Sequence, residues 1–272
     1  MQRNISGMQT VPRSIGFFTA LRRYGQIISA LLQREQERRR QAPLEGILDV
    51  LEPVVFIGLM SILWTVMSRR NNSPVGDSAI LFVATGFYAK FFWICLAKVR
   101  KGELGSPRKR FPVERRLDYA FVLVIITTID YAILGFVGFG IIYIFVTPTA
   151  LPYDFLAVIE GMVAIIMLGF GWGMISLTIT RFFWPWVYFT AVFNRGLSLF
   201  SGLFFLIETL PPDLRYYLSL NPMYHAIALF RTGFYSNYPK GSLDTTYLAF
   251  WAIFAVLIGL VLERVTVRAE EE

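Results

Sequence analysis

Long apolar runs separated by short polar segments dominate this sequence. Runs of about 20 residues can cross a hydrocarbon core of about 30 Å as helices. We therefore predict an all-α integral membrane protein with six transmembrane helices. The predicted spans cover residues 49–68, 79–97, 119–146, 154–179, 186–207 and 246–262. The third is long enough that it should tilt or project past the lipid.

The segment before the first span, residues 1–48, holds no apolar run of spanning length, and we expect no removable signal peptide there. Within it, residues 15–41 carry apolar side chains at spacings of three and four, with arginines between them. This pattern predicts an N-terminal amphipathic helix in the inner-leaflet interface, with arginines on anionic headgroups. Packing of this helix on a soluble partner is the alternative.

Between the fifth and sixth spans, residues 208–244 are apolar but interrupted by prolines. Asn221 directly precedes Pro222, and a capping residue beside a proline is a good helix start. We predict two helices of about ten residues here, too short to cross the membrane. They should form a re-entrant or interfacial helical hairpin on the outer side, near 212–220 and 222–233.

The polar loop 98–118 carries eight of the chain's lysines and arginines. Short basic loops beside membrane spans stay in the cytoplasm. That orientation places 19 of the 26 lysines and arginines on the cytoplasmic side and 5 on the outer side. We therefore expect a multi-pass protein with both termini in the cytoplasm.

Composition supports a membrane protein and excludes several other classes. The chain of 272 residues is 55% hydrophobic and 17% charged, against about 45–50% apolar and about 25% charged residues in soluble domains. The net charge of +7 is clustered beside apolar runs, which argues against nucleic acid. With one cysteine (Cys95) and one histidine (His225), Cys-based or His-pair metal sites are excluded and a Ser-His-Asp triad is disfavoured.

No nucleotide-binding motif is found in the chain. There is no G-x-x-x-x-G-K-[ST] phosphate loop, so we expect no ATP hydrolysis by this route and no cofactor or metal bound by this chain. Gly169, Gly171 and Gly173 superficially resemble a nucleotide loop but lie inside a predicted span. Gly169 and Gly173, four residues apart, are better explained as a small-residue face for helix packing.

Lys90, Asp130 and Arg195 lie near the middle of predicted spans, and Glu160 lies nearer the outer end of the fourth. A charge at the bilayer centre costs about 2.5–3.5 kcal/mol on insertion scales, so these side chains should face the protein interior or water. One hypothesis is a polar track for an anionic, hydrated substrate, with Lys90 and Arg195 as its cationic contacts. The other is structural pairing, such as Lys90 with Asp130 or Arg195 with Glu160. The aromatic residues around Lys90 could stack on sugar rings or simply face lipid.

The order of these features resembles the membrane subunit of type-2 ABC exporters that move polysaccharides. The resemblance rests on Leu51-Glu52-Pro53 opening the first span, on Arg110-Phe-Pro-Val113 in the basic loop, and on Asn221-Pro222-Met-Tyr-His225 before the last span. It runs from about residue 28 to the C-terminus. Capsular polysaccharide export permeases are the most similar group, and O-antigen and teichoic-acid permeases are near relatives.

The resemblance implies a second copy of the permease, two copies of a nucleotide-binding ATPase subunit, and a coupling helix in loop 98–118 that docks on the ATPase. The candidate ATPase-coupling residues are Arg108, Arg110, Glu114 and Arg115. It also implies that spans one and five line a channel. Together with the surroundings of Lys90, this predicts a substrate path of Glu52, Tyr88, Lys90, Trp93, Asn194 and Arg195. The outer hairpin would form an outer gate with Asn221, Tyr224 and His225.

We therefore expect a permease that moves lipid-linked capsular polysaccharide across the bacterial inner membrane, with ATP and Mg²⁺ bound by the partner ATPase. The other expected partners are the bilayer and periplasmic or outer-membrane export proteins. The alternatives are O-antigen, teichoic acid or a drug in the same machinery. A membrane-embedded glycosyl- or acyltransferase is less favoured, because the basic loop offers only Glu103, Glu114 and Asp118 among its arginines. A secondary transporter is disfavoured because no inverted repeat is found.

Overall fold

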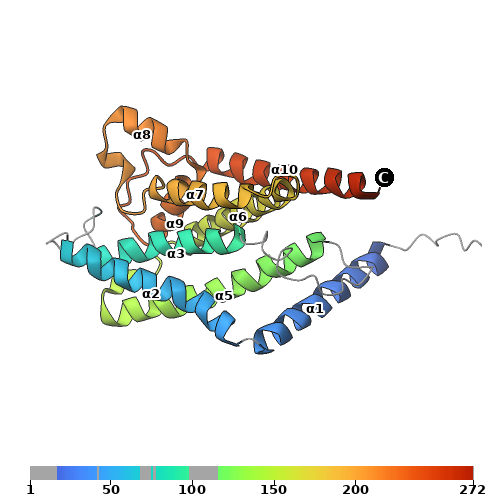
Figure 1. The fold of residues 1–272 in the computed structure, drawn as a ribbon. Coiled ribbons are helices and arrows are strands. Elements are labelled where there is room, and N and C mark those ends of the chain that lie inside the picture. Colours follow the sequence, from blue (N-terminus) through green and yellow to red (C-terminus); the bar gives the residue numbers. More distant parts are fainter. Residues whose placement is uncertain (1–16, 42, 68–74, 76–77, 98–115, 272) are drawn as a thin grey trace, which may run out of the picture.

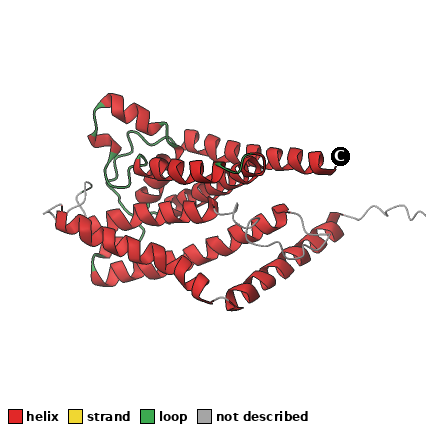
Figure 2. Ribbon diagram, viewed as in Figure 1, coloured by secondary structure: helices red, strands yellow, loops and turns green. Residues whose placement is uncertain are grey.

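A computed structural model describes residues 17–41, 43–67, 75, 78–97 and 116–271 of the chain. Every extended regular element in this part is a helix (Figure 2). The all-α prediction is therefore confirmed for the described residues. The α-helices are α1 (Phe17–Gln41), α2 (Pro43–Met67), α3 (Ala79–Ala97), α5 (Arg116–Phe145), α6 (Phe155–Phe182), α7 (Trp186–Leu199), α8 (Pro212–Ser219), α9 (Pro222–Thr232) and α10 (Thr245–Glu271).

Helix α3 occupies the centre of the molecule. Residues 81–89 are all buried, and Phe82 and Phe92 have no exposed surface. Helices α2 and α5 lie on one side of α3, with α6 and α9 on the other (Figure 1). A helix surrounded by other helices needs apolar residues on every face. This explains why no polar stripe marks the sequence of α3.

Helices α6 and α10 pack closely against each other. A Cβ atom added at Gly171 would come within 2.5 Å of the Ala255 carbonyl carbon, and one added at Gly259 within 2.8 Å of a side chain on α6. A Cβ added at Gly169 would come within 2.7 Å of Leu96 on α3. Small residues at these positions let the helices approach closely. The predicted packing role is confirmed for Gly169, which meets α3; Gly173 is buried, and Gly171, which was not predicted to pack, meets α10.

The fifth apolar segment is broken partway along its length. Helix α7 ends at Leu199, although the sequence predicted a span that continues to residue 207. Gly202 has a φ of +72°, in the left-handed region that glycine enters without a steric cost. Arg231 satisfies the backbone released by this break: its Nη1 donates to the Gly202 carbonyl at 2.7 Å and its Nη2 to the Leu203 carbonyl at 2.9 Å. Non-helical backbone in an apolar environment needs partners of this kind.

Helices α8 and α9 form the hairpin after this break. No residue of α8 is buried, whereas residues 223–232 of α9 are all buried against α3, α6 and α10. The Asn221 side chain accepts from the Met223 amide at 3.0 Å, so the predicted cap at the start of α9 is confirmed. A Cβ added at Gly161 would come within 2.9 Å of the Phe230 backbone. Helix α9 therefore lies inside the helical bundle rather than on its surface.

The elements divide between two ends of the molecule. Helix α5 begins and α10 ends at one end, while α8 and the short turn Pro148–Ala150 lie at the other (Figure 1). Among the helices in the described ranges, four are long and apolar enough to cross a membrane: α3, α5, α6 and α10. The apolar stretch described in α2, Leu51–Trp64, is shorter. Helix α7 has 14 residues and reaches only about 21 Å.

Candidate functional site

The predicted site residues fall into three regions. Arg108, Arg110, Glu114 and Arg115 lie outside the described residues. The predicted substrate path is distributed over α2, α3 and α7, and the predicted outer gate lies at the start of α9. Where the structure describes His, Cys, Asp and Glu side chains, no three of them gather as a metal site would require.

Lys90 is the charged residue of α3, and it lies among aromatic rings. Its Nζ atom is 5.6 Å from the ring centroid of Phe56, 5.2 Å from that of Phe87 and 5.7 Å from that of Phe91. A cation over the face of an aromatic ring is attracted by the ring's quadrupole. This arrangement stabilises the charge without neutralising it, and Lys90 stays only half-buried.

The structural pairings considered for the two cations do not form. Asp130 is bound to Arg39 at 2.7 Å, and among the described residues neither Lys90 nor Arg195 forms an ion pair. Arg195 is exposed on α7 and lies near enough to Lys90 for the two charges to repel. Because repulsion between like charges falls when an anion binds between them, this arrangement favours an anionic ligand.

Asn194, the residue before Arg195, is held by a row of aromatic rings. Its Oδ1 atom accepts a hydrogen bond from Trp172 Nε1 at 3.1 Å. Trp172 stacks on Phe193 with centroids 5.2 Å apart, Phe193 on Phe189 at 5.9 Å, and Phe189 on Trp186 at 4.8 Å. Phe189 and Phe193 are exposed. The row therefore presents flat apolar surfaces on α7, the helix that carries Arg195, and sugar rings can stack on such surfaces.

Tyr88 and Trp93 occupy different surroundings from the cations. Tyr88 is 4% exposed, and its hydroxyl donates to the Tyr131 carbonyl at 2.6 Å. Its ring stacks on Phe230 with centroids 5.4 Å apart. Trp93 is 3% exposed and packs near Gly169. In the single chain these two residues fill the core, so their positions give no support for direct contact with a substrate. Glu52 is exposed on α2.

The three predicted outer-gate residues join α9 to its neighbours. Asn221 Nδ2 donates to the Leu197 carbonyl of α7 at 2.9 Å. The Tyr224 hydroxyl donates to Glu208 Oε1 at 2.8 Å. Burial raises the pKa of Tyr224 above its usual value, and the hydrogen bond to Glu208 raises it further. This phenol therefore remains a hydrogen-bond donor at physiological pH.

His225 connects the hairpin to the start of α10. Its Nε2 lies 2.6 Å from the Ser219 carbonyl, and its Nδ1 lies 3.1 Å from the Asp244 amide nitrogen. A neutral imidazole with its proton on Nε2 matches both partners, because Nδ1 then accepts the Asp244 N–H. Burial lowers the pKa of His225, although Ser219 and Asp244 oppose this effect. Protonation would set two donors, Nδ1–H and the Asp244 N–H, against each other.

Arg231 is the residue that sequence reasoning missed, since it was assigned to an outer segment without a role. It is 1% exposed, and besides the carbonyls at the α7 break its Nη2 donates to the Phe82 carbonyl at 2.9 Å. Its Nε donates to Thr85 Oγ1 at 3.3 Å, and its guanidinium lies 3.7 Å from the ring centroid of Phe82. The available signal was its place in the otherwise apolar stretch 226–234. Arg231 joins α3, α9 and the break after α7.

Comparison with known proteins places this architecture in a family. The model of the ABC-2 type transporter family matches residues 26–235. The chain is 23% identical over 241 residues to the capsule polysaccharide export inner-membrane protein CtrC of Neisseria meningitidis serogroup A, covering 86% of this chain and 88% of that protein. It is 25% identical over 254 residues to CtrC of serogroup B, covering 90% of each. It is 23% identical over 241 residues to the capsule polysaccharide export inner-membrane protein BexB of Haemophilus influenzae, covering 88% of this chain and 90% of that protein. The chain therefore belongs to the ABC-2 type transporter family and is one of its membrane permeases.

Proposed function

We propose that two copies of this permease, joined to a separate ATPase, export lipid-linked capsular polysaccharide across the bacterial inner membrane. The three relatives named above are capsule polysaccharide export inner-membrane proteins. The family implies that ATP is used by a partner subunit. ATP and Mg²⁺ would accordingly be held by the partner, and the permease would supply the path.

The observation that carries the proposal at the level of the site is a pair of cations, Lys90 and Arg195, whose charges repel each other and which form no ion pair among the described residues. Arg195 follows the aromatic row of α7 in sequence. An acidic polymer offers both of the groups that this surface would bind: anionic substituents for the cations and sugar rings for the aromatic faces. Asn194 and Glu52 would add polar contacts along the same path.

A six-span topology with both termini in the cytoplasm is part of the proposal. Helix α2 and the broken α7 segment would be the two further membrane spans, in addition to α3, α5, α6 and α10. The charge bias of 19 against 5 supports this orientation. The start of α5 and the end of α10 at the same end of the molecule agree with it. The α8–α9 hairpin would then lie on the outer side, with Asn221, Tyr224 and His225 closing the outer mouth.

The second copy would pack on the faces of α2 and α7. Leu59 and Ile62 of α2 are 59% and 64% exposed, and Val192 of α7 is 70% exposed. Pairing across these faces would enclose Lys90 and Arg195 in a shared channel. On the cytoplasmic side, loop 98–118 would bind the ATPase through Arg108, Arg110, Glu114 and Arg115. The three arginines would suit an acidic docking groove.

Complementation tests the substrate. The chain and its ATPase are expressed in strains that each lack the permease for one surface polymer: capsule, O-antigen or teichoic acid. We expect capsular polymer to return to the surface, as measured with polymer-specific antibodies. Recovery of O-antigen or teichoic acid alone would contradict the capsular substrate and leave the permease assignment intact.

Alanine variants test the cationic path in the strain that the wild-type chain restores. Arg195→Ala and Lys90→Ala should each reduce export on the order of tenfold, since each removes one charge-assisted contact of about 1.5–3 kcal/mol. Arg264→Ala is the matched control, because Arg264 is exposed and lies on α10, which carries none of the proposed path residues. Wild-type export by both path variants, at equal membrane abundance, would remove these residues from the path.

A further inference from the structure

Helix α1 is fastened to α5 by apolar contacts and by hydrogen bonds. Leu31 is buried in a cluster with Val122 and Ile126 of α5. One turn later, Glu35 is 3% exposed and accepts a hydrogen bond from the Tyr119 hydroxyl at 3.5 Å. A buried carboxylate is costly without partners. The face of α1 that carries Leu31 and Glu35 is therefore fitted to α5 rather than to lipid alone.

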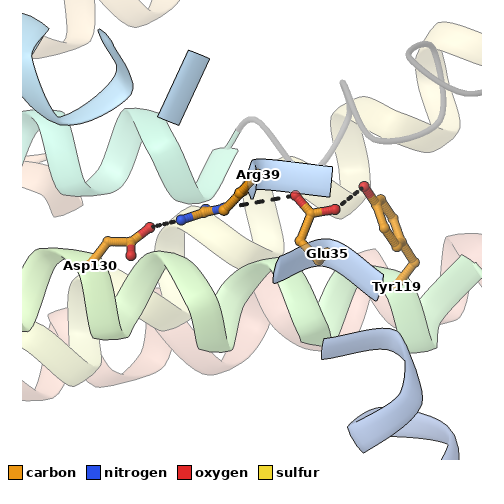
Figure 3. A network of polar contacts seen from close by, with 4 residues as sticks. All are labelled: Glu35, Arg39, Tyr119 and Asp130. Carbon is orange, nitrogen blue, oxygen red and sulfur yellow. Dashed lines mark hydrogen bonds and ion pairs between the residues drawn. The ribbon is translucent and has the colours of Figure 1, made fainter. Parts of the chain in front are cut away.

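Arg39 extends the same contact further along α5. Its Nη1 donates to Asp130 Oδ2 at 2.7 Å, and its Nε lies 3.9 Å from Glu35 Oε1. Figure 3 shows the guanidinium between the two carboxylates, with Tyr119 on the far side of Glu35. Asp130 lies about 21 Å along α5 from its first residue, within a candidate membrane span. Because a lone carboxylate at such depth is unfavourable, Asp130 fixes the position of Arg39 and therefore of α1.

The contact between α1 and α5 lies between the basic loop and α2 in the chain connections. Helix α5 begins at Arg116, so the last three residues of the predicted loop 98–118 belong to it, and α1 is separated from α2 by one residue, between Gln41 and Pro43. Among its neighbouring helices, α5 packs mainly on α1 and α3 and only lightly on α2 and α6. The α1–α5 contact is therefore one route from the loop to α2, which carries Glu52 of the proposed path; the other is α3, which ends directly before the loop and packs on α2.

We propose that Arg39, Asp130 and Glu35 are positioning residues that make α1 and α5 move as one body, so that a displacement of the basic loop is transmitted to α2. This inference rests on the proposed docking of the ATPase at that loop. The residues touch neither ATP nor polymer. Their loss should uncouple the two activities: the assembled complex would still hydrolyse ATP, but export would fall.

Charge reversal tests the linkage in the complete complex. Arg39→Asp and Asp130→Arg each place like charges together, and the double variant restores a pair of opposite charges. We expect each single variant to reduce export on the order of tenfold, within the range typical of coupling between sites. In the single variants, ATPase activity and co-purification of the ATPase should stay within about twofold of wild type. The double variant should recover most of the export. A double-mutant cycle of the four export rates then measures the coupling between the two positions.

Arg40→Asp is the matched control, because Arg40 is the next residue of α1 and is exposed. It should export at the wild-type level. Wild-type export by both single variants would overturn the proposal. Failure of the double variant to exceed the single variants, with all proteins present in the membrane, would overturn it as well.

A cross-link tests whether the two helices move together. In a Cys95→Ser background, Leu31→Cys and Val122→Cys are oxidised to join α1 to α5. If α1 and α5 move as one rigid body, export should survive the cross-link. Loss of export on oxidation, reversed by reductant, would show that the contact must open and would contradict the proposal. The readout is whichever polymer the wild-type chain exports, so an error in the assigned substrate does not affect this test.

Discussion

Two arginines hold helices in place in this molecule, and they do so in opposite ways. Arg231, in the buried hairpin helix α9, is 1% exposed and donates to the carbonyls of Phe82, Gly202 and Leu203. Arg39, on the N-terminal helix α1, is 35% exposed and binds the Asp130 carboxylate. Arg231 supplies hydrogen-bond donors to backbone carbonyls that follow the end of α7. Arg39 joins two intact helices.

The difference determines what each contact tolerates. Three carbonyls converge on Arg231 from two segments far apart in sequence, and few other side chains supply donors in that fork geometry. The Arg39–Asp130 contact requires only opposite charges at two positions, so exchanging the residues can preserve it. We therefore expect α9 and the α7 break to behave as fixed architecture and the α1–α5 contact to be adjustable. Removal of the Arg231 contact should therefore lower the free energy of unfolding more than removal of the Arg39–Asp130 contact.

The largest effect is expected for Arg231→Ala. Removing the guanidinium leaves buried carbonyls without donors, each at a cost of about 1–3 kcal/mol, so we expect a loss of at least about 3 kcal/mol in the free energy of unfolding. The variant should be depleted from membranes, as measured by immunoblot and by thermal unfolding in detergent.

Two further variants check that explanation. Arg231→Lys keeps the charge but not the fork, and it should fall between wild type and Arg231→Ala. Gly86→Ala should also destabilise the protein, because its Cβ would lie 2.5 Å from Arg231 Nη2. An Arg231→Ala protein of normal abundance and melting temperature would show that the break after α7 does not need this side chain.

An intermediate effect is expected at His225, which joins α8 to the start of α10. His225→Ala removes two hydrogen bonds and should cost about 1–2 kcal/mol. Because burial lowers the pKa of the folded imidazole, the unfolded chain binds the proton more tightly. The contribution of His225 is therefore complete above about pH 6.5 and is lost as the pH falls through the lower pKa of the folded state.

Thermal unfolding of wild type and His225→Ala at pH 7.5 and pH 5 measures this difference. The gap between the two proteins should narrow at pH 5. A gap that is equal at both pH values would mean that His225 does not change its protonation on unfolding.

The smallest effect on stability is expected for Arg39→Ala. The variant leaves one carboxylate, Asp130, without its cation, and the side chains of Arg39 and Asp130 are 35% and 30% exposed, so neither is fully buried. We expect a loss of about 1 kcal/mol in the free energy of unfolding, less than for the three carbonyls of Arg231. A loss as large as that of Arg231→Ala would mean that the α1–α5 contact is also fixed architecture, and the comparison between the two arginines would fail.

Local patterns predicted the elements well. Hydropathy located α3, α5, α6 and α10, and Asn221 before Pro222 marked the start of α9. These signals succeed because spanning length and helix capping depend on residues that are neighbours in sequence. Helix α1 was likewise expected over residues 15–41 from its spacing, and the structure describes it from Phe17.

The partners of buried polar groups could not be found in the same way. Asp130 was considered as a partner for Lys90, but it binds Arg39, which is 91 residues away. Arg231 bonds to carbonyls up to 149 residues away, and backbone carbonyls carry no sequence signal. The end of α7 was missed for a related reason: residues 200–207 are as apolar as a span, and only the bonds to Arg231 make their non-helical path favourable.

The close packing of α6 on α10 has a consequence for how such a permease can diversify. Gly171 and Gly259 leave no volume for a larger side chain, and Arg181 is bound to the buried Glu263 at 3.2 Å. Random substitution should therefore be selected against along this seam, whereas the faces of α2 and α7, where we propose that the second copy packs, have no such steric limit within one chain. A saturation library scored for survival in the membrane would map that contrast. Changes of cargo would then accumulate on one half of the molecule while the other half stays nearly invariant.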